Sequence, residues 1–427
     1  MSLIERDKKV VWHPFTQQQT SGDPLEIVRA EGVILFGANE KEYIDANSSW
    51  WVNVHGHAHP HIGKAISDQF QTIDHVVFAG VTHPKAVELA ERIVAKLPAK
   101  LQKVFFSDNG STAVEVGLKM AFQYFHNQNQ DRKRVVALDG AYHGDTFGAM
   151  SVGQRGYFNA PFEPFFFDVD YLDFPTEEDQ DAILSHARKL FEMEDVAVLI
   201  VEPLVQGAAG MRMYSAEFLD QLTAIAHQFG SLVIFDEVMT GFGRTGKLFA
   251  MDFCEHKPDI VALSKGLTAG VIPMGLTVAS QKVYDAFLSE EKTKAFLHGH
   301  SFTANPIACA VACASLDIFD QKETFENIAS IESWGNDFIE ELNTVSCVQN
   351  TRQSGTIVAF EIETREGNTY FSDIREQAYT YFLEHGVLLR PLGNTLFVNP
   401  PYSISKKEYH RISSVIINFL LTIDSVS

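Results

Sequence analysis

The middle of the chain alternates short apolar segments with longer segments whose apolar residues recur at helical spacing. The apolar segments are 103–107, 134–138, 196–201, 232–236 and 259–264, and the helical ones are 111–126, 181–192 and 216–229. Continuously apolar strands separated by helices are typical of a parallel sheet with helices on both faces. The alternation therefore predicts an α/β fold with a mostly parallel sheet flanked by helices.

The two ends of the chain show shorter and more polar patterns, which predict a second, smaller domain. The C-terminal part has helical patterns at 316–345 and 372–386 and strand patterns at 355–362 and 395–399. Residues 25–45 predict a hairpin that joins this domain. We expect a large domain at 50–315 and a small α+β domain formed by 1–49 and 316–427, which the length of 427 residues accommodates.

Charge and hydropathy narrow the class of partner. Lys and Arg total 34 against 55 Asp and Glu, a net charge of −21, which repels nucleic acid and anionic membranes and favours a small-molecule partner. The N-terminus has no apolar signal region, and no apolar run reaches the about 18 residues that span a membrane. We expect a cytoplasmic protein whose four cysteines are buried thiols rather than disulfide or metal ligands.

Two charged residues follow neighbouring apolar segments at the ends where ligands bind in parallel sheets. Asp236 ends segment 232–236, and a buried carboxylate there needs a cation or a ring N–H as its partner. Lys265 directly follows the next segment, and a lysine in an apolar site has a lowered pKa and attacks carbonyl groups. The pair predicts a site that uses a lysine amine beside a carboxylate.

A third feature, residues 107–122, predicts a phosphate site. A strand ends, Asp108, Asn109 and Gly110 form a turn, and Ser111 or Thr112 can cap the helix that follows. The free N–H groups of a helix start bind phosphate. A phosphate site, a lysine and a carboxylate are together what pyridoxal phosphate (PLP) requires from a protein, so we expect PLP as the cofactor.

Two other motifs are only weak indications of a binding site. Residues 241–246 match Gly-x-Gly-x-x-Gly, but they do not lie directly at a strand–helix turn and no good helix follows, so we reject a dinucleotide site and a nicotinamide oxidoreductase. Histidines 55, 57, 59 and 61 alternate along a short segment, yet they would point to both of its faces and no carboxylate lies among them. We therefore expect no metal site.

Over nearly its whole length the chain resembles the class III aminotransferases, PLP enzymes of fold type I. The matching segments are 12–15 (WHPF), 48–51 (SSWW), 108–111 (DNGS), 142–151 (YHGDTFGAMS), 202–207 (EPLVQG), 211–214 (MRMY), 236–237 (DE), 241–246 (GFGRTG), 264–265 (SK), 298–301 (HGHS) and 390–391 (RP). The segments at 12, 48, 142 and 211 are most similar to members that transfer an amino group from S-adenosylmethionine to 8-amino-7-oxononanoate, giving 7,8-diaminononanoate for biotin.

The resemblance implies a role for each matching residue. Lys265 attaches to the cofactor and moves the substrate proton, Asp236 pairs with the pyridine nitrogen, and Tyr142 stacks on the ring. The phosphate is held by Gly110 and Ser111, and by His300 and Ser301 of a second copy in a homodimer with shared sites. The substrate pocket is implied to contain Phe15, Trp50, Tyr142, Gly299 and Arg390.

Two positions depart from the family pattern and leave the amino donor open. Phe15 stands where members that use S-adenosylmethionine usually have tyrosine, and His300 with Ser301 stands where Pro-Thr is usual. Lysine is therefore a second possible donor, and another class III ω-amino-acid transaminase is a second possible enzyme. A PLP-binding protein without activity is disfavoured by the intact set of Lys265, Asp236, Tyr142 and Arg390.

Overall fold

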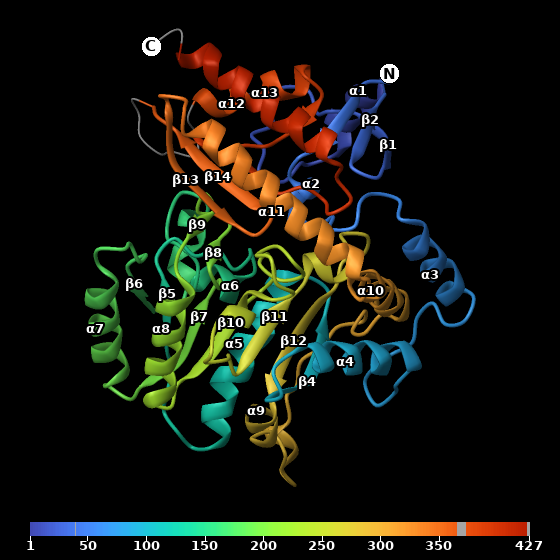
Figure 1. Cartoon of the computed structure of the whole chain (residues 1–427). Helices are drawn as coiled ribbons and strands as arrows, with labels where there is room; N and C mark the ends of the chain where they lie inside the picture. Colours follow the sequence, from blue (N-terminus) through green and yellow to red (C-terminus); the bar gives the residue numbers. More distant parts are fainter. Residues whose placement is uncertain (39, 365–372, 425–427) are drawn as a thin grey trace.

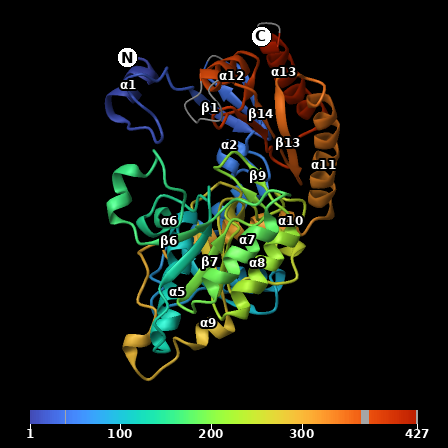
Figure 2. The same ribbon diagram turned by 90° about the vertical axis from the view of Figure 1, so that its left-hand side faces the viewer.

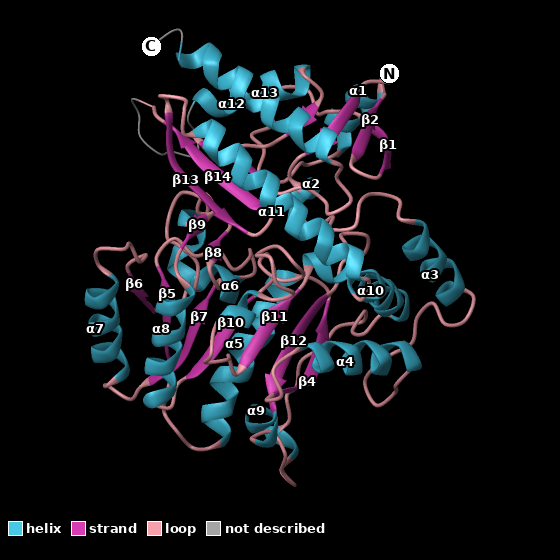
Figure 3. Ribbon diagram, in the orientation of Figure 1, coloured by secondary structure: helices cyan, strands magenta, loops and turns pink. Residues whose placement is uncertain are grey.

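A seven-stranded sheet forms the centre of the larger part of the molecule (Figures 1 and 3). The computed structural model describes residues 1–38, 40–364 and 373–424. The strand order is β4-β12-β11-β10-β7-β5-β6, and β6, β5, β7, β10 and β11 are parallel. The strands are β4 (Leu101–Ser107), β5 (Arg134–Leu138), β6 (Val169–Leu172), β7 (Val196–Val201), β10 (Leu232–Asp236), β11 (Ile260–Leu263) and β12 (Gly275–Ser280).

Helices cover both faces of this sheet, as the sequence predicts. Helix α5 (Gly110–Asn127) packs on one face, and α8 (Ala216–Gln228) packs on the other beside α7 (Gln180–Phe191). Successive residues of a strand point to opposite faces. Accordingly, Val233 and Phe235 belong to one hydrophobic core while Ile234 belongs to the second. The predicted α/β fold with a mostly parallel sheet is confirmed.

Strand β12, like β6, is a part of the sheet that the sequence patterns do not predict. It runs antiparallel to both β11 and β4 and so separates two strands that would otherwise be adjacent. Its sequence, GLTVAS, contains Gly, Thr and Ser, although all six residues are buried. A fully buried strand has no alternation of polar and apolar residues, so its periodicity carries little signal.

Two smaller sheets and three long helices form the upper part of Figure 1. The first sheet has the order β1-β2-β3-β15 and the second has the order β13-β14-β16. Because β15 pairs with β3, the N-terminal strands join the C-terminal elements, as expected for 25–45. The elements are β1 (Ile27–Glu31), β2 (Ile34–Gly37), β3 (Glu42–Asp45), β13 (Val348–Ser354), β14 (Ile357–Ile362), β15 (Val387–Leu388), β16 (Thr395–Val398), α11 (Lys322–Leu342), α12 (Asp373–Glu384) and α13 (Lys406–Asp424).

The segment 316–345, predicted as one helix, belongs to two. Helix α10 (Pro306–Phe319) has Asp320 as its C-cap, and Gln321 is extended (φ −79°, ψ 132°) before α11 begins. The break follows from burial, because α10 is enclosed by protein while α11 covers the surface of the second sheet. Of the segment 372–386, α12 covers 373–384, and residue 372 lies outside the described residues.

The remaining elements connect these parts (Figure 2). They are α1 (Leu3–Val10), α2 (Ser48–Trp51), α3 (Pro60–Phe70), α4 (Pro84–Lys96), α6 (Phe147–Ser151), α9 (Gln281–Asp285), the short strands β8 (Val205–Gln206) and β9 (Arg212–Met213), and four 3-10 helices at Ala160–Phe165, Ala250–Phe253, Lys265–Thr268 and Lys292–Lys294. None of the described helices is long and apolar enough to cross a membrane. All four cysteines are buried, which agrees with the prediction of buried thiols.

Candidate active site

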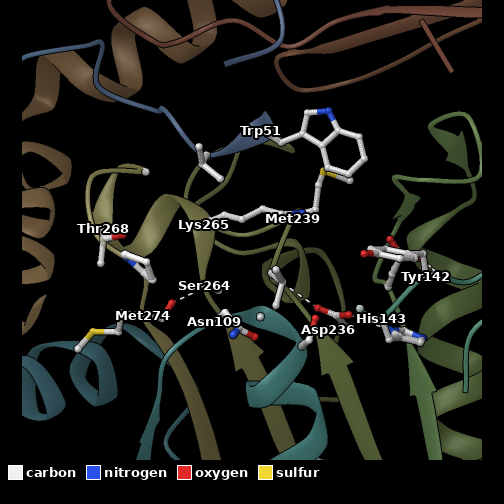
Figure 4. Close-up of a pocket in the computed structure, with 18 of the residues that line it drawn as sticks. Trp51, Asn109, Tyr142, His143, Asp236, Met239, Ser264, Lys265, Thr268 and Met274 are labelled. Carbon is white, nitrogen blue, oxygen red and sulfur yellow. Dashed lines mark hydrogen bonds and ion pairs between the residues drawn. The ribbon is translucent and has the colours of Figure 1, made fainter. Parts of the chain in front are cut away.

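A cavity of about 340 Å³ lies where the carboxyl ends of the central strands meet the start of α5 (Figure 4). The carboxyl ends of parallel strands share one edge of a sheet, so residues that follow different strands come together there. Its lining includes the predicted residues Gly110, Ser111, Tyr142, Asp236 and Lys265. The structure thus brings together residues that are up to 155 positions apart in the chain.

Lys265 follows β11 and points into this cavity (Figure 4). Its backbone has a left-handed conformation (φ 47°), which begins the short 3-10 helix. The amine nitrogen lies 4.6 Å from the centroid of the Trp51 ring. Burial lowers the pKa of Lys265 to about 8, although the carboxylates of Asp236 and Glu202 oppose this shift. A larger fraction of this amine is neutral and nucleophilic at neutral pH than for an exposed lysine.

Asp236 ends β10 and is held by two hydrogen bonds. Its Oδ1 accepts the backbone N–H of Val238 at 3.0 Å, and its Oδ2 accepts the Nδ1–H of His143 at 2.7 Å. The other ring nitrogen of His143 is buried and has no hydrogen-bond partner among the described residues. Asp236 is therefore oriented toward the cavity as an acceptor, with a polar histidine beside it in the lining.

Glu202 is a buried carboxylate of the site that carried no predicted role. It follows β7, and its two oxygens accept the backbone N–H groups of Tyr142 at 2.9 Å and Gly207 at 3.0 Å. Burial raises its pKa to about 7, and the nearby Asp236 carboxylate adds to the shift while His143 opposes it. The signal in the sequence is the one that identified Asp236, an acid directly after a continuously apolar strand.

The start of α5, where a phosphate site is predicted, borders the cavity and has a different cap from the one predicted. Asn109, rather than Ser111 or Thr112, is the N-cap, because its backbone is extended and its side chain accepts the Thr112 N–H at 2.9 Å. The helix therefore begins at Gly110, and the N–H groups of Gly110 and Ser111 have no intrahelical acceptor. These two groups border the cavity.

Two glycines allow the close packing around this helix start. A Cβ atom at Gly144, which has φ +120°, would lie 2.0 Å from the Ser111 hydroxyl oxygen. A Cβ atom at Gly275, on β12, would lie 2.2 Å from the Asn109 carbonyl oxygen. Larger residues at either position would displace the residues at the start of α5.

The two tryptophans of α2 point to different places. Ser49 (φ 60°, ψ −83°) and Trp50 (φ −131°, ψ 56°) are not helical, so Trp51 lines the cavity while Trp50 lies outside its lining and is 42% exposed. The Trp50 ring contacts Phe15, with 5.7 Å between centroids, and the guanidinium carbon of Arg390 lies 5.2 Å from its centroid. Phe15, Trp50 and Arg390 therefore form a group of their own.

Residues 298–301 lie away from the cavity lining of their own chain. His298 is hydrogen-bonded to Lys119 at 2.9 Å, and Ser301 is exposed. The Nε2 atom of His300 is buried and has no hydrogen-bond partner among the described residues. Gly299, His300 and Ser301 are thus not brought to the site by a single chain, and their role stays a prediction.

The motifs that were set aside have structural partners. His57 pairs with Asp45 at 3.0 Å and His61 with Asp317 at 2.8 Å, and the described residues contain no group of three or more side chains that could hold a metal ion. The glycine-rich loop 241–246 is followed by a four-residue 3-10 helix rather than by the α-helix that a dinucleotide site requires.

The sheet and the lysine–aspartate pair at adjacent strand ends define an enzyme of the transaminase class. Residues 16–420 match the model of the family Aminotransferase class-III, and the chain belongs to this family. It is an aminotransferase of fold type I, as the resemblance predicts.

Three relatives illustrate the similarity. The chain is 46% identical to the adenosylmethionine-8-amino-7-oxononanoate aminotransferase of Synechococcus elongatus, over 96% of this chain and 98% of that protein. The crystal structure of the enzyme of that name from Methanocaldococcus jannaschii is 33% identical, with a TM-score of 0.94 over 98% of both chains. An amine transaminase from an uncultivated Pseudomonas species, solved in its PLP-bound form, is 28% identical with a TM-score of 0.88 over 97% of this chain and 98% of that one.

Proposed function

We propose that this protein is a PLP-dependent transaminase that transfers an amino group from S-adenosylmethionine to 8-amino-7-oxononanoate, giving 7,8-diaminononanoate in biotin biosynthesis. The observation that carries the reaction class is the convergence of Lys265, Asp236 and the start of α5 on one cavity. The choice of substrates is supported by the names of the relatives, which match nearly the full length of the chain at 33–46% identity.

The residues of the cavity fit the cofactor. The free N–H groups at the start of α5 suit its phosphate, and the amine of Lys265 suits its aldehyde. The Asp236 carboxylate can accept the N–H of the cofactor's pyridine ring. His143, which also lines the cavity, has a ring nitrogen without a hydrogen-bond partner among the described residues, so the lining has a further polar atom available. When bound, PLP withdraws electrons from the substrate α-carbon, which makes its proton removable.

Each of these residues then has a defined task. Lys265 Nζ holds the cofactor before substrate binds and afterwards carries a proton, for which a pKa of about 8 is suited near neutral pH. Asp236 keeps the ring nitrogen protonated because its negative charge stabilises the cation. Glu202 holds the backbone of Tyr142 in place, so that the tyrosine ring can cover the cofactor.

Residues outside the cavity complete the proposal. Arg390 is a bidentate donor suited to a substrate carboxylate. Gly299, His300 and Ser301 act in the site of a second copy, which makes the protein a homodimer. The same proposal includes a large domain at 50–315 and a small domain formed by 1–49 and 316–427. It also includes a cytoplasmic location, as for a biosynthetic enzyme.

A single-turnover assay with separate donors tests the function. The PLP-loaded protein is mixed with S-adenosylmethionine or with lysine, and the decrease of the cofactor's long-wavelength absorbance band is followed. The acceptor, 8-amino-7-oxononanoate, is then added. We expect S-adenosylmethionine to discharge the band and the acceptor to restore it. Discharge by lysine alone would transfer the donor role to lysine, and restoration by other ketones but not by this acceptor would contradict the proposed reaction.

A further inference from the structure

The backbone of Lys265 adopts a conformation that residues other than glycine rarely adopt. Its φ of 47° lies in the left-handed region, which is unfavourable for a residue with a Cβ atom. Such a conformation persists only where the surrounding structure holds it. Because the Lys265 side chain points into the cavity from this backbone (Figure 4), the contacts that hold the segment also decide where the amine lies.

Hydrogen bonds between close neighbours in the chain hold part of this turn. The N–H of Gly270 donates to the carbonyl of Lys265 at 3.3 Å, and the N–H of Ala269 donates to the carbonyl of Gly266 at 3.1 Å. These two bonds shape the turn, but they do not attach it to the rest of the molecule. A contact from another element is needed to fix the turn relative to the cavity.

Ser315 provides such a contact from α10. It is fully buried, and its hydroxyl donates to the carbonyl of Gly266, the residue after Lys265, at 3.3 Å. A serine hydroxyl inside a helix can bond to a carbonyl of its own helix, but this one reaches the turn instead. Packing confines the same point, because a Cβ atom at Gly266 would lie 2.8 Å from the Cβ of Phe242.

His55 is the second partner of the Ser315 hydroxyl. Its Nε2 atom lies 3.1 Å from the hydroxyl oxygen, and its ring packs against Phe319 of α10 with 4.5 Å between centroids. Burial lowers the pKa of His55 to about 3, and His59 adds to this shift, so the ring is neutral and has one N–H. Because the hydroxyl gives its one hydrogen to Gly266, the N–H of His55 is at Nε2 and donates to the hydroxyl oxygen.

We infer that Ser315 is a positioning residue for the nucleophile: its hydroxyl, oriented by His55, holds the Gly266 carbonyl and so keeps the Lys265 amine directed at the cofactor. This inference rests on the proposed function, in which Lys265 carries PLP. Neither Ser315 nor His55 is part of the cavity lining, so both act through the backbone of the turn. Attack on a carbonyl needs a defined distance and direction, and a small displacement of the amine therefore lowers its rate.

The rate at which PLP attaches to the cofactor-free protein reports the position of Lys265 without requiring turnover. We expect Ser315→Ala to slow attachment about three- to tenfold at every pH, as for the loss of one hydrogen bond that orients a reacting group. The midpoint of the pH profile should stay near 8, because the substitution removes no charge. In the loaded enzyme kcat should fall by a similar factor, while the KM of each substrate stays within twofold.

Two further variants test the chain of contacts. His55→Phe keeps a ring against Phe319 but has no N–H, so it should slow attachment as Ser315→Ala does. The double variant should be no slower than Ser315→Ala alone, because both changes act through one hydrogen bond. Ser315→Cys is close to serine in size but is a weak donor, so it should also slow attachment, and it replaces Ser315→Ala if that chain does not fold.

Ser231→Ala is the matched control. Ser231 is also buried, and its hydroxyl also donates to a backbone carbonyl, that of Val196, at 2.9 Å. It precedes β10 and so lies at the edge of the sheet opposite the site. Ser231→Ala should lower the urea midpoint of unfolding, as Ser315→Ala should, but it should leave the attachment rate within twofold of the wild type.

Three results would overturn the inference. Attachment at the wild-type rate in folded Ser315→Ala would show that the hydroxyl stabilises the fold alone, and equal slowing in Ser231→Ala would show that any lost buried hydroxyl has this effect. Additive slowing in the double variant would show that His55 does not act through Ser315. A wild type that attaches no PLP contradicts the proposed function itself, and this result is seen before any variant is made, so the two failures are distinguishable.

Discussion

Lys265 is the residue on which the proposed chemistry depends most. Its replacement by alanine removes the nucleophile and the proton carrier, so we expect Lys265→Ala to lower turnover by more than about 10³-fold. The fold should persist, because the side chain lies in a cavity rather than in a packed core. Turnover and circular dichroism measure the two effects.

A chemical test identifies the lysine directly. Borohydride treatment should attach PLP permanently to the wild type, so that the protein keeps cofactor absorbance, but not to Lys265→Ala. The matched control is Lys189→Ala, a change of an exposed lysine on α7, which should behave as the wild type does. Fixed absorbance in Lys265→Ala would mean that another lysine carries the cofactor.

The lowered pKa of Lys265 makes a prediction about pH. Only the neutral amine attacks an aldehyde, and burial lowers the pKa of this amine to about 8. The rate of PLP attachment to the cofactor-free protein should therefore rise about tenfold per pH unit below 8 and level off above it. Nα-acetyl-lysine, measured in parallel, corrects for the ionisation of PLP itself. A rate that continues to rise beyond pH 9 would contradict the prediction.

At the scale of elements, Glu237 connects β10 to the 3-10 helix Ala250–Phe253 across the glycine-rich loop. Its carboxylate is fully buried and accepts the N–H groups of Met251 at 2.7 Å and Ala250 at 2.9 Å, and the Thr240 hydroxyl at 3.0 Å. Burial raises its pKa to about 7, although these hydrogen bonds oppose the shift. The loop that carries the conspicuous glycines is thus held by a buried acid.

The substitution Glu237→Gln should lower the free energy of unfolding by about 1–3 kcal/mol at pH 8, because the new amide places an NH₂ group against a backbone N–H. Between pH 4.5 and about 7, the Glu237 carboxyl is protonated in the folded protein but ionised in the unfolded chain. Glu237 therefore stabilises the fold at low pH, and this contribution is lost as the pH rises through about 7. The wild type should therefore gain stability relative to Glu237→Gln as pH falls toward 5.

Urea unfolding at pH 5 and pH 8 measures both effects. Glu255→Gln, a change of an exposed glutamate, provides the control and should leave the midpoint unchanged at both pH values. Equal midpoints for Glu237→Gln and the wild type at pH 8 would show that the buried acid does not hold the loop.

At the scale of the whole molecule, the segment 298–301 tests whether two chains share a site. Mixed dimers of Lys265→Ala and Ser301→Asp chains would contain one site with both changes and one with neither. The aspartate is chosen because its charge repels a phosphate. We expect activity to appear on mixing two nearly inactive variants, to at most about a quarter of the wild type.

Subunit exchange has to be verified for this experiment, for example with one chain carrying an affinity tag. Activity that remains absent in confirmed mixed dimers would mean that Ser301 acts in its own chain or not at the site.

The sequence by itself determined the strands β10 and β11, the helices α5, α7 and α8, and the lysine and aspartate at the ends of the two strands. These features are local, because burial on both faces makes a strand continuously apolar and parallel strands bring their ends to one edge. The N-terminal strands could also be assigned to the smaller part from their pattern alone. The sequence determined the boundaries of elements less well, because the segment 316–345, predicted as one helix, is divided between α10 and α11.

Only the tertiary structure decided how distant residues meet. It inserted β12 between β4 and β11, turned Trp51 rather than Trp50 into the cavity, and placed Glu202 under the backbone of Tyr142. It also brought Phe158 to Phe15 across more than 140 positions of the chain. The physical reason is that such contacts depend on backbone kinks and packing between segments far apart in the chain, which leave no periodic pattern in the sequence itself.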